Sequence, residues 1–164
     1  MESTFNIATQ KIAVLGFGNP VREDDGVGIY IIQKLKEQIK DAENISIFDM
    51  GTSAFEVLFK LKGHDRIILV DAVINSGEPV GTVFKLPASK IDAQIQDDPM
   101  VFLHSLKWDQ ALSYAKKMLG DDYPKNIEVY LVAINETRFN VGMTDDATKG
   151  GDKVINILLQ ELND

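Results

Sequence analysis

The sequence predicts an α/β sandwich with a largely parallel β-sheet. Short apolar segments rich in β-branched residues alternate with segments whose apolar residues recur at helical spacing. A turn-forming stretch between residues 75 and 81 suggests one hairpin, which would make the sheet mixed. Because no repeat, linker or low-complexity run divides the 164 residues, we expect one domain over residues 1–164, with residues 1–10 as a flexible leader.

The first half of the chain predicts three strands separated by helices. Residues 11–16 are apolar on both faces and end in glycine, which is typical of a buried strand. An amphipathic helix is expected over about residues 25–39, and a second strand over residues 45–49, followed by another helix. Residues 66–72 are apolar and β-branched until a carboxylate appears near the end, which predicts a third buried strand.

The second half predicts a fourth strand over residues 82–86, returning as a hairpin partner of the third strand. Residues 88–103 are polar and weakly patterned, so we expect a loop with at most one helical turn. A helix over Trp108–Leu119 and a strand over Asn126–Ala133 follow. Thr144 is the expected N-cap of a last helix that has two aspartates in its first turn.

The composition argues against several classes of partner. A formal net charge of −8 and a pI of about 4.7 oppose binding to nucleic-acid phosphates and to anionic membrane surfaces. No apolar run reaches the roughly 18 residues of a membrane helix, and the N-terminal residues lack the basic-then-apolar pattern of a signal peptide. We therefore expect a cytoplasmic, soluble protein without nucleic-acid or membrane partners.

The absence of cysteine and of common catalytic motifs narrows the chemistry further. Without cysteine there is no thiol nucleophile or thiolate site, so any metal must be bound by nitrogen and oxygen. Neither a Gly-x-Ser-x-Gly elbow, a His-Glu-x-x-His zinc motif nor a phosphate loop is present. Gly16 and Gly18 begin like a dinucleotide-binding turn, but Val21 stands where the third glycine is needed, so no cofactor-binding site is expected.

Three residues are candidates for a functional site: Asp25, Asp71 and His104. Asp25 follows the first predicted strand and Asp71 ends the third, so both should lie at the carboxyl edge of the sheet, where open α/β sheets bind ligands. If His104 comes from a loop over the same edge, two carboxylates and an imidazole could converge on a divalent ion with coordination positions left open. Open positions suit catalysis or substrate recognition.

Each candidate also has an ordinary structural explanation. Asp25 precedes Gly26 at a helix start and could cap the free backbone amides there. His104 could be an ordinary loop histidine. Asp71 is harder to explain in this way, because a carboxylate in an apolar strand is costly unless it is paired, coordinated or solvated. A structural hydrogen-bonding role is its alternative.

Several motifs, taken in their order along the chain, resemble those of the hydrogenase maturation proteases. Residues 18–28, GNPVREDDGVG, are similar to the family signature GNxxxxDDGxG. The resemblance continues through ILVDA at residues 68–72, GT at 81–82 and HSL at 104–106, so it spans most of the chain. Two departures, MGT at residues 50–52 where the family often has GGT and one residue inserted before Gly81, do not touch the three candidate residues.

The resemblance implies a three-layer α/β/α sandwich around a twisted, mixed sheet of about five strands. It also implies an endopeptidase that recognises nickel already inserted into the precursor of a nickel-iron hydrogenase large subunit and then removes its C-terminal extension. Asp25, Asp71 and His104 match the family's metal site, at which nickel would arrive with the substrate, although another divalent metal could bind there in vitro. The precursor is the expected partner, and we expect a monomer.

The mechanism has more than one interpretation at this stage. Because nucleophile motifs are absent, we expect hydrolysis by water, with Asp25 or Asp71 as the candidate general base. A rival from another class is a non-enzymatic nickel-handling chaperone that holds the large subunit through the same residues. A second rival is a different peptidase on this scaffold, since the spore germination proteases have a similar fold.

Overall fold

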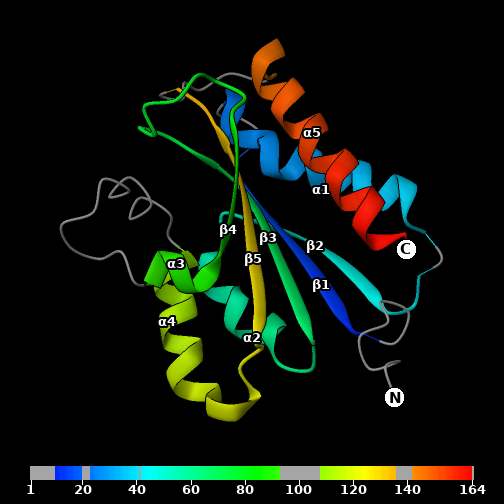
Figure 1. The fold of residues 1–164 in the computed structure, drawn as a ribbon, viewed down its shortest axis with the longest axis vertical. Helices are drawn as coiled ribbons and strands as arrows, with labels where there is room; N and C mark the ends of the chain where they lie inside the picture. Colours follow the sequence, from blue (N-terminus) through cyan, green and yellow to red (C-terminus); the bar gives the residue numbers. More distant parts are fainter. Residues whose placement is uncertain (1–9, 20–22, 41, 93–107, 136–141, 164) are drawn as a thin grey trace.

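The computed structural model describes residues 10–19, 23–40, 42–92, 108–135 and 142–163, which form one sheet flanked by helices on both faces (Figure 1). The strands are β1 (Ile12–Phe17), β2 (Ile45–Gly51), β3 (Arg66–Val73), β4 (Val83–Pro87) and β5 (Asn126–Ala133). The α-helices are α1 (Val27–Gln38), α2 (Val57–Leu61), α3 (Ala88–Asp92), α4 (Trp108–Leu119) and α5 (Asp145–Leu162). Three short 3-10 turns are η3 (Glu23–Gly26), η4 (Ala54–Glu56) and η6 (Gly120–Asp122).

The five strands lie in the order β2-β1-β3-β5-β4. Every neighbouring pair is parallel except β4 with β5, so the sheet is mixed and mostly parallel, as predicted. Parallel neighbours cannot be joined by a tight turn, and α1 and α2 provide the crossovers from β1 to β2 and from β2 to β3. The carboxyl ends of β1, β2, β3 and β5 therefore meet at one edge.

The expected hairpin between the third and fourth strands is wrong. β5 lies between them: it pairs in parallel with all of β3, from Arg66 opposite Asn126 to Val73 opposite Ala133. β4 then pairs antiparallel with the outer side of β5, with Val83 opposite Val132. A turn sequence shows only that the chain reverses direction locally and does not identify the partner strand. Because β5 pairs with β3 along its whole length, the position beside β3 is occupied by β5 and not by β4.

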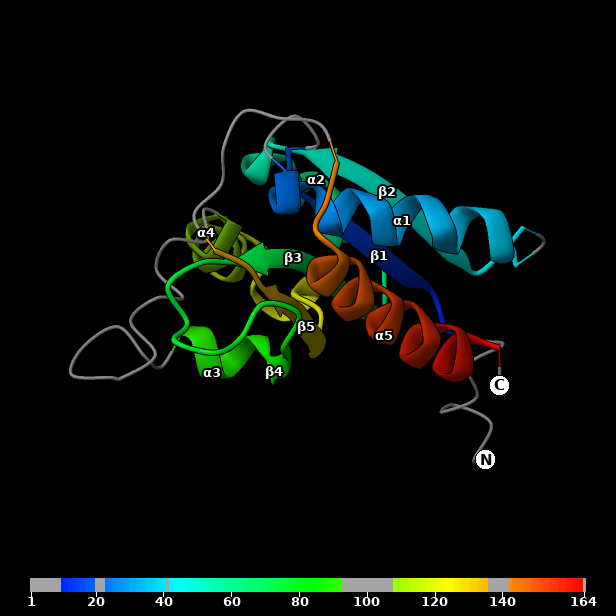
Figure 2. The same cartoon turned by 90° about the horizontal axis from the view of Figure 1, so that it is seen from above.

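Two apolar cores lie on opposite faces of the sheet (Figure 2). The face covered by α1 and α5 buries alternate residues of the central strands, and the face covered by α2 and α4 buries the others, as the two-residue period of a strand requires. Strands that are apolar on both faces are typical of a parallel sheet with helices on both sides. The predicted sandwich class is thereby confirmed.

Gly28, in the first turn of α1, allows that helix to lie directly against the sheet. A methyl group added at its Cα would stand 2.0 Å from the carbonyl oxygen of Phe17 and 3.1 Å from that of Val70. Both obstacles are backbone atoms in the two central strands, so they cannot move aside as a flexible side chain would. The loop before α1, which contains Asp25, is held close to the sheet by this contact.

We expect Gly28→Ala to lower the free energy of unfolding by about 3 kcal/mol, the upper end for an overpacked site. A matched control is Gly63→Ala, whose added methyl meets no atom within 4 Å and which has only the strain of its positive φ of 90°. That variant should lose about 1 kcal/mol. Urea unfolding of both variants measures the difference, and equal losses would contradict the steric explanation.

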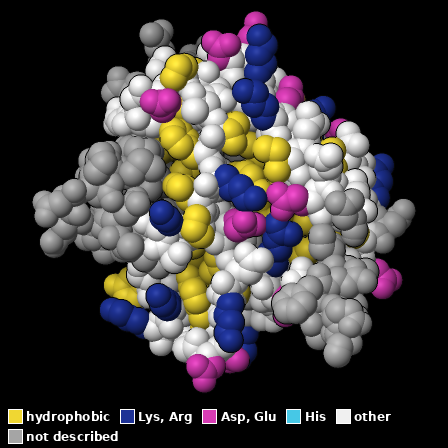
Figure 3. All heavy atoms as spheres, viewed as in Figure 1, with side chains coloured by type: hydrophobic (Ala, Val, Ile, Leu, Met, Phe, Trp, Pro, Cys, Tyr) yellow, Lys and Arg dark blue, Asp and Glu magenta, His cyan; other side chains and the backbone are white. Residues whose placement is uncertain are grey.

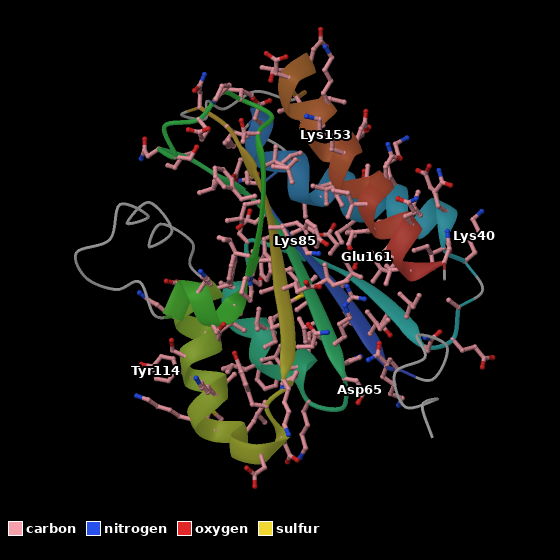
Figure 4. All side chains as sticks on the ribbon, viewed as in Figure 1. Lys40, Asp65, Lys85, Tyr114, Lys153 and Glu161 are labelled. Carbon is pink, nitrogen blue, oxygen red and sulfur yellow. The ribbon has the colours of Figure 1, made fainter. Side chains whose placement is uncertain are left out.

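A charged cluster at the amino ends of the strands ties α5 to the sheet. Arg66 on β3 forms ion pairs with Glu128 on β5 and Glu161 on α5, and Lys85 on β4 lies 3.6 Å from Glu128 and 3.7 Å from Glu161. Figure 4 shows Lys85 and Glu161 on neighbouring elements. The Tyr130 hydroxyl donates to Glu161 at 2.9 Å, and burial, together with this hydrogen bond, raises the pKa of the Tyr130 phenol. The cluster anchors the end of the sheet opposite the candidate site.

The surface carries charges of both signs. On the face shown in Figure 3, lysine and arginine side chains are interspersed with aspartate and glutamate side chains over the described part of the chain. Such alternation is typical of a solvated surface rather than of a patch that tracks phosphates. None of the helices described in the structure is long and apolar enough to cross a membrane.

Candidate functional site

Asp71 lies near the carboxyl end of β3 and points to the face covered by α2 and α4. The strand alternation fixes this direction: Leu69 and Val73 belong to the core on that face, and Val70 and Ala72 to the core on the other. Only 9% of Asp71 is exposed. The sequence therefore places a carboxylate where an apolar side chain would ordinarily complete the core.

Two hydrogen bonds hold the Asp71 carboxylate. The backbone N–H of Ala72 donates to Oδ1 at 2.7 Å, and the indole Nε1–H of Trp108 donates to Oδ2 at 2.9 Å. Trp108 is itself buried at the start of α4 and stacks on Phe17 of β1, with ring centroids 6.2 Å apart. The position of the carboxylate is thus set by β1, β3 and α4 together.

Burial raises the pKa of Asp71 from its ordinary value of 3.8 to about 8. The hydrogen bonds from Trp108 and Ala72 act in the opposite direction but do not offset the loss of solvation, and the negative charge of Asp25 raises the pKa further. In the metal-free protein Asp71 therefore exchanges its proton near neutral pH. A carboxyl group with this property can act as a general acid or base.

Asp25 is positioned by the loop that follows β1. It lies in η3 and is partly buried, and its Oδ2 and its carbonyl oxygen accept hydrogen bonds from the backbone N–H of Asn19 at 3.1 and 3.2 Å. Gly18 is required there, because a methyl at its Cα would stand 2.2 Å from the Asp25 carbonyl oxygen. The N-cap residue of α1 is Gly26, not Asp25, and it makes no side-chain capping hydrogen bond.

Asp24, the residue before Asp25, is almost completely buried. Its two oxygens accept hydrogen bonds from the backbone N–H and the hydroxyl of Thr144, at 2.7 and 2.8 Å. Thr144 caps α5 as predicted, since its Oγ1 accepts from the backbone N–H of Ala147 at 3.3 Å. The turn that carries Asp25 is therefore attached directly to the start of the last helix.

The structure brings together two of the three predicted site residues. Asp25 lies close enough to Asp71 for its charge to raise the pKa of that group, and both lie at the carboxyl edge of the sheet. His104 lies outside the described residues, so its place in the site stays a prediction. Within the part of the chain that the structure describes, no three His, Cys, Asp or Glu side chains form a group that could hold a metal ion.

The donor chemistry of the acid pair fits a hard or borderline divalent cation. Each Asp71 oxygen accepts one N–H and retains a second lone pair, so the carboxylate can still bind a cation. Two adjacent carboxylates in a poorly solvated place also repel each other, and a cation would relieve that repulsion. The pair alone leaves most coordination positions to other groups.

Trp108 and Asp24 are the site residues that sequence reasoning missed. Trp108 had a detectable signal, because a buried tryptophan usually finds an acceptor for its N–H, and it begins a predicted helix soon after His104. Asp24 had none, because its partner Thr144 is 120 residues away and a doublet of acids in a loop is ordinary. Only the folded arrangement distinguishes Asp24 from its neighbours.

The fold and the acid pair define a class: an open α/β protein with a carboxylate site at the carboxyl edge of its sheet. The sequence profile of the hydrogenase maturation proteases, HycI, matches residues 29–161. The chain therefore belongs to the hydrogenase maturation protease family, as the motif resemblance predicted, and this is a family of peptidases.

Relatives of the chain agree with this assignment. MJ0253 of Methanocaldococcus jannaschii, which carries the same family description, is 30% identical over 158 residues, covering 92% of this chain and 96% of its own. The hydrogenase 2 maturation protease of Escherichia coli is 26% identical over 134 residues, covering 82% and 79% of the two chains. The structure of the maturating endopeptidase HybD from Escherichia coli matches with a TM-score of 0.76 at 23% identity, covering 93% and 92%, which shows the shared fold.

Proposed function

We propose that this protein is an endopeptidase that removes the C-terminal extension of a nickel-iron hydrogenase large-subunit precursor after nickel insertion. Nickel belongs to the substrate in this proposal, and Asp25, Asp71 and His104 are the residues that recognise it. The observation that carries the proposal is the pair of Asp25 and buried Asp71 at the carboxyl edge of the sheet, in a chain of the maturation protease family.

The absence of cysteine suits this division of ligands. Nickel bound by the precursor's thiolates still accepts nitrogen and oxygen donors, which are the donors of the three proposed residues, and this chain has no thiolate of its own. A protease without thiolates can contact the ion without removing it from the precursor. Recognition of the metal and retention of the metal are then separate properties of the two proteins.

The residues of the site also supply what peptide hydrolysis needs. Water attacks the scissile carbonyl carbon, a base takes the proton of that water, and the leaving amine must receive a proton when the C–N bond breaks. Asp71 is one candidate for the base, since burial brings its pKa to about 8 in the metal-free protein. Asp25 is the alternative base, and the Trp108 hydrogen bond keeps Asp71 in one orientation during the cycle.

The test is to incubate the protein with nickel-loaded and nickel-free large-subunit precursor and to follow the precursor by mass spectrometry. We expect the nickel-loaded precursor to lose the mass of a short C-terminal peptide and the nickel-free precursor to remain intact. The His104→Ala variant should leave both intact. A precursor that binds but keeps its mass would instead identify a nickel-handling chaperone, and full cleavage by His104→Ala would remove that residue from the site.

A further inference from the structure

Asp24 connects the turn that carries Asp25 to a segment 120 residues further along the chain. Both carboxylate oxygens accept hydrogen bonds from one residue, Thr144, at 2.7 Å from its N–H and 2.8 Å from its hydroxyl. Only 6% of Asp24 is exposed, so these contacts are poorly accessible to competing water. Charge-assisted, two-point hydrogen bonds of this kind fix orientation as well as distance.

The Thr144 hydroxyl serves two groups at once, and its direction is fixed by chemistry. A carboxylate that accepts through both oxygens leaves the hydroxyl proton to be donated to Asp24, and the hydroxyl oxygen then accepts from Ala147 N–H at 3.3 Å. The N-terminus of the 18-residue helix α5 also carries partial positive charge, which favours a carboxylate at this position. The Thr144 side chain therefore both holds Asp24 and caps α5.

Asp25 is held on its other side by the loop after β1. Asn19 N–H donates to both the side chain and the carbonyl of Asp25, and Gly18 packs against that carbonyl without room for a methyl group. The η3 turn is thus fixed at two points, by Asn19 at one side and by Thr144 through Asp24 at the other. Releasing either point lets the Asp25 carboxylate move relative to Asp71, which is built into β3.

We propose that Asp24 is a positioning residue, and that its two hydrogen bonds to Thr144 set the place of the Asp25 carboxylate beside Asp71. The part of its test that measures precursor cleavage rests on the proposed peptidase function. Asp24 does not touch the reacting atoms in this inference: it acts through Asp25. A purely structural clamp would change how much protein is folded, but not the rate of cleavage per folded molecule.

Three variants separate positioning from folding. Thr144→Val keeps the shape and the backbone N–H but removes the hydroxyl, Asp24→Asn replaces one of the two acceptor oxygens by an N–H donor and removes the charge, and Thr144→Ser keeps the hydroxyl. The matched control is Tyr30→Phe, which removes a hydrogen bond between α1 and α5, from Tyr30 to Asp152 at 2.6 Å, without touching the η3 turn. Cleavage of nickel-loaded precursor is measured per folded molecule, with the folded fraction taken from urea unfolding.

We expect Thr144→Val and Asp24→Asn to lower kcat/KM by about 10- to 100-fold, the cost of losing a residue that orients a ligand. Thr144→Ser and Tyr30→Phe should cleave at the wild-type rate. Cleavage per folded molecule at the wild-type rate by both Thr144→Val and Asp24→Asn would overturn the inference, even if both variants are less stable.

A second measurement does not depend on activity. Amide hydrogen exchange at Asn19 reports the hydrogen bond to Asp25 directly, and its protection should fall by about tenfold in Thr144→Val, the loss of about one hydrogen bond. Tyr30→Phe should leave that protection unchanged. If the wild-type protein cleaves no precursor, the proposed function fails while exchange still decides the role of Asp24. If the protection of the Asn19 amide is unchanged in both Thr144→Val and Asp24→Asn, the positioning role of Asp24 is refuted.

Discussion

Asp71→Asn should lose about 10²- to 10⁴-fold in kcat/KM on nickel-loaded precursor, the range for removal of a general acid or base. The amide keeps the size of the carboxylate, and its oxygen can still accept from Trp108 Nε1–H, so the local packing is preserved. What it loses is the negative charge that would contact a cation and the ability of a carboxyl group to take up and release a proton. Both losses act on the chemistry rather than on the fold.

A matched control for this substitution is Asp121→Asn. Asp121 is an exposed acid in η6, at the opposite end of α4 from Trp108, and the substitution changes the net charge by the same amount. It should cleave at the wild-type rate. Mass spectrometry of the precursor with time gives both rates, and efficient cleavage by Asp71→Asn would show that the pair of Asp25 and Asp71 is not the active site.

The stability of the metal-free protein should fall as pH rises from about 4 to about 8, and Asp71 should be the cause. Burial raises the folded-state pKa of Asp71 from 3.8 to about 8, so in this window the folded protein holds a proton that the unfolded chain has released. Because the folded state binds more protons, raising the pH favours unfolding. The contribution is fully present below about pH 4 and lost as pH passes 8.

The size of this contribution follows from the shift itself. A gap of about four pH units is on the order of 5 kcal/mol, a large part of the stability of an ordinary domain. Other carboxylates act in the opposite direction: the hydrogen bonds from Arg66 and Tyr130 lower the pKa of Glu161, although burial opposes them. The readout is therefore the difference between Asp71→Asn and wild type, not the wild-type curve alone.

Urea unfolding at pH 5, 7 and 9 in the presence of a chelator measures that difference. Asp71→Asn loses the bond from Ala72 N–H, worth about 1 kcal/mol, but it has no charge to bury. It should be more stable than wild type at pH 9, with an advantage that shrinks towards pH 5. Asp121→Asn should follow wild type at every pH, and an Asp71→Asn curve parallel to wild type would mean that Asp71 ionises freely in the folded protein.

The elements of the fold were predictable because their signals are local. Apolar runs such as residues 66–72 and the helical spacing of Trp108–Leu119 depend only on near neighbours in the sequence, and the structure has β3 and α4 there. The position of β4 beside β5 was not predictable, because it depends on which of two strands competes better for the edge of β3. No local sequence pattern shows whether β4 or β5 pairs better with β3.

The site divides in the same way. Asp71 could be selected from sequence because a carboxylate in an apolar strand has a cost that needs an explanation, and the raised pKa shows that cost. Asp25 could be selected because it lies in the motif of residues 18–28 and follows β1. The contributions of Trp108 and Thr144 depend on contacts across 37 and 120 residues, which no spacing rule encodes.

The order of the strands has a consequence for biosynthesis. β4 precedes β5 in the chain, yet β5 is the strand to which β4 pairs, so β4 has no sheet partner until residues 126–133 have left the ribosome. Until then β3 is the unpaired edge of the sheet, and one of its two apolar faces is not yet covered by α5. The hydrogen bonds of Asp24 likewise form only after Thr144 has been made, so a chain that ends after β5 has all five strands but lacks the contact that holds the turn carrying Asp25.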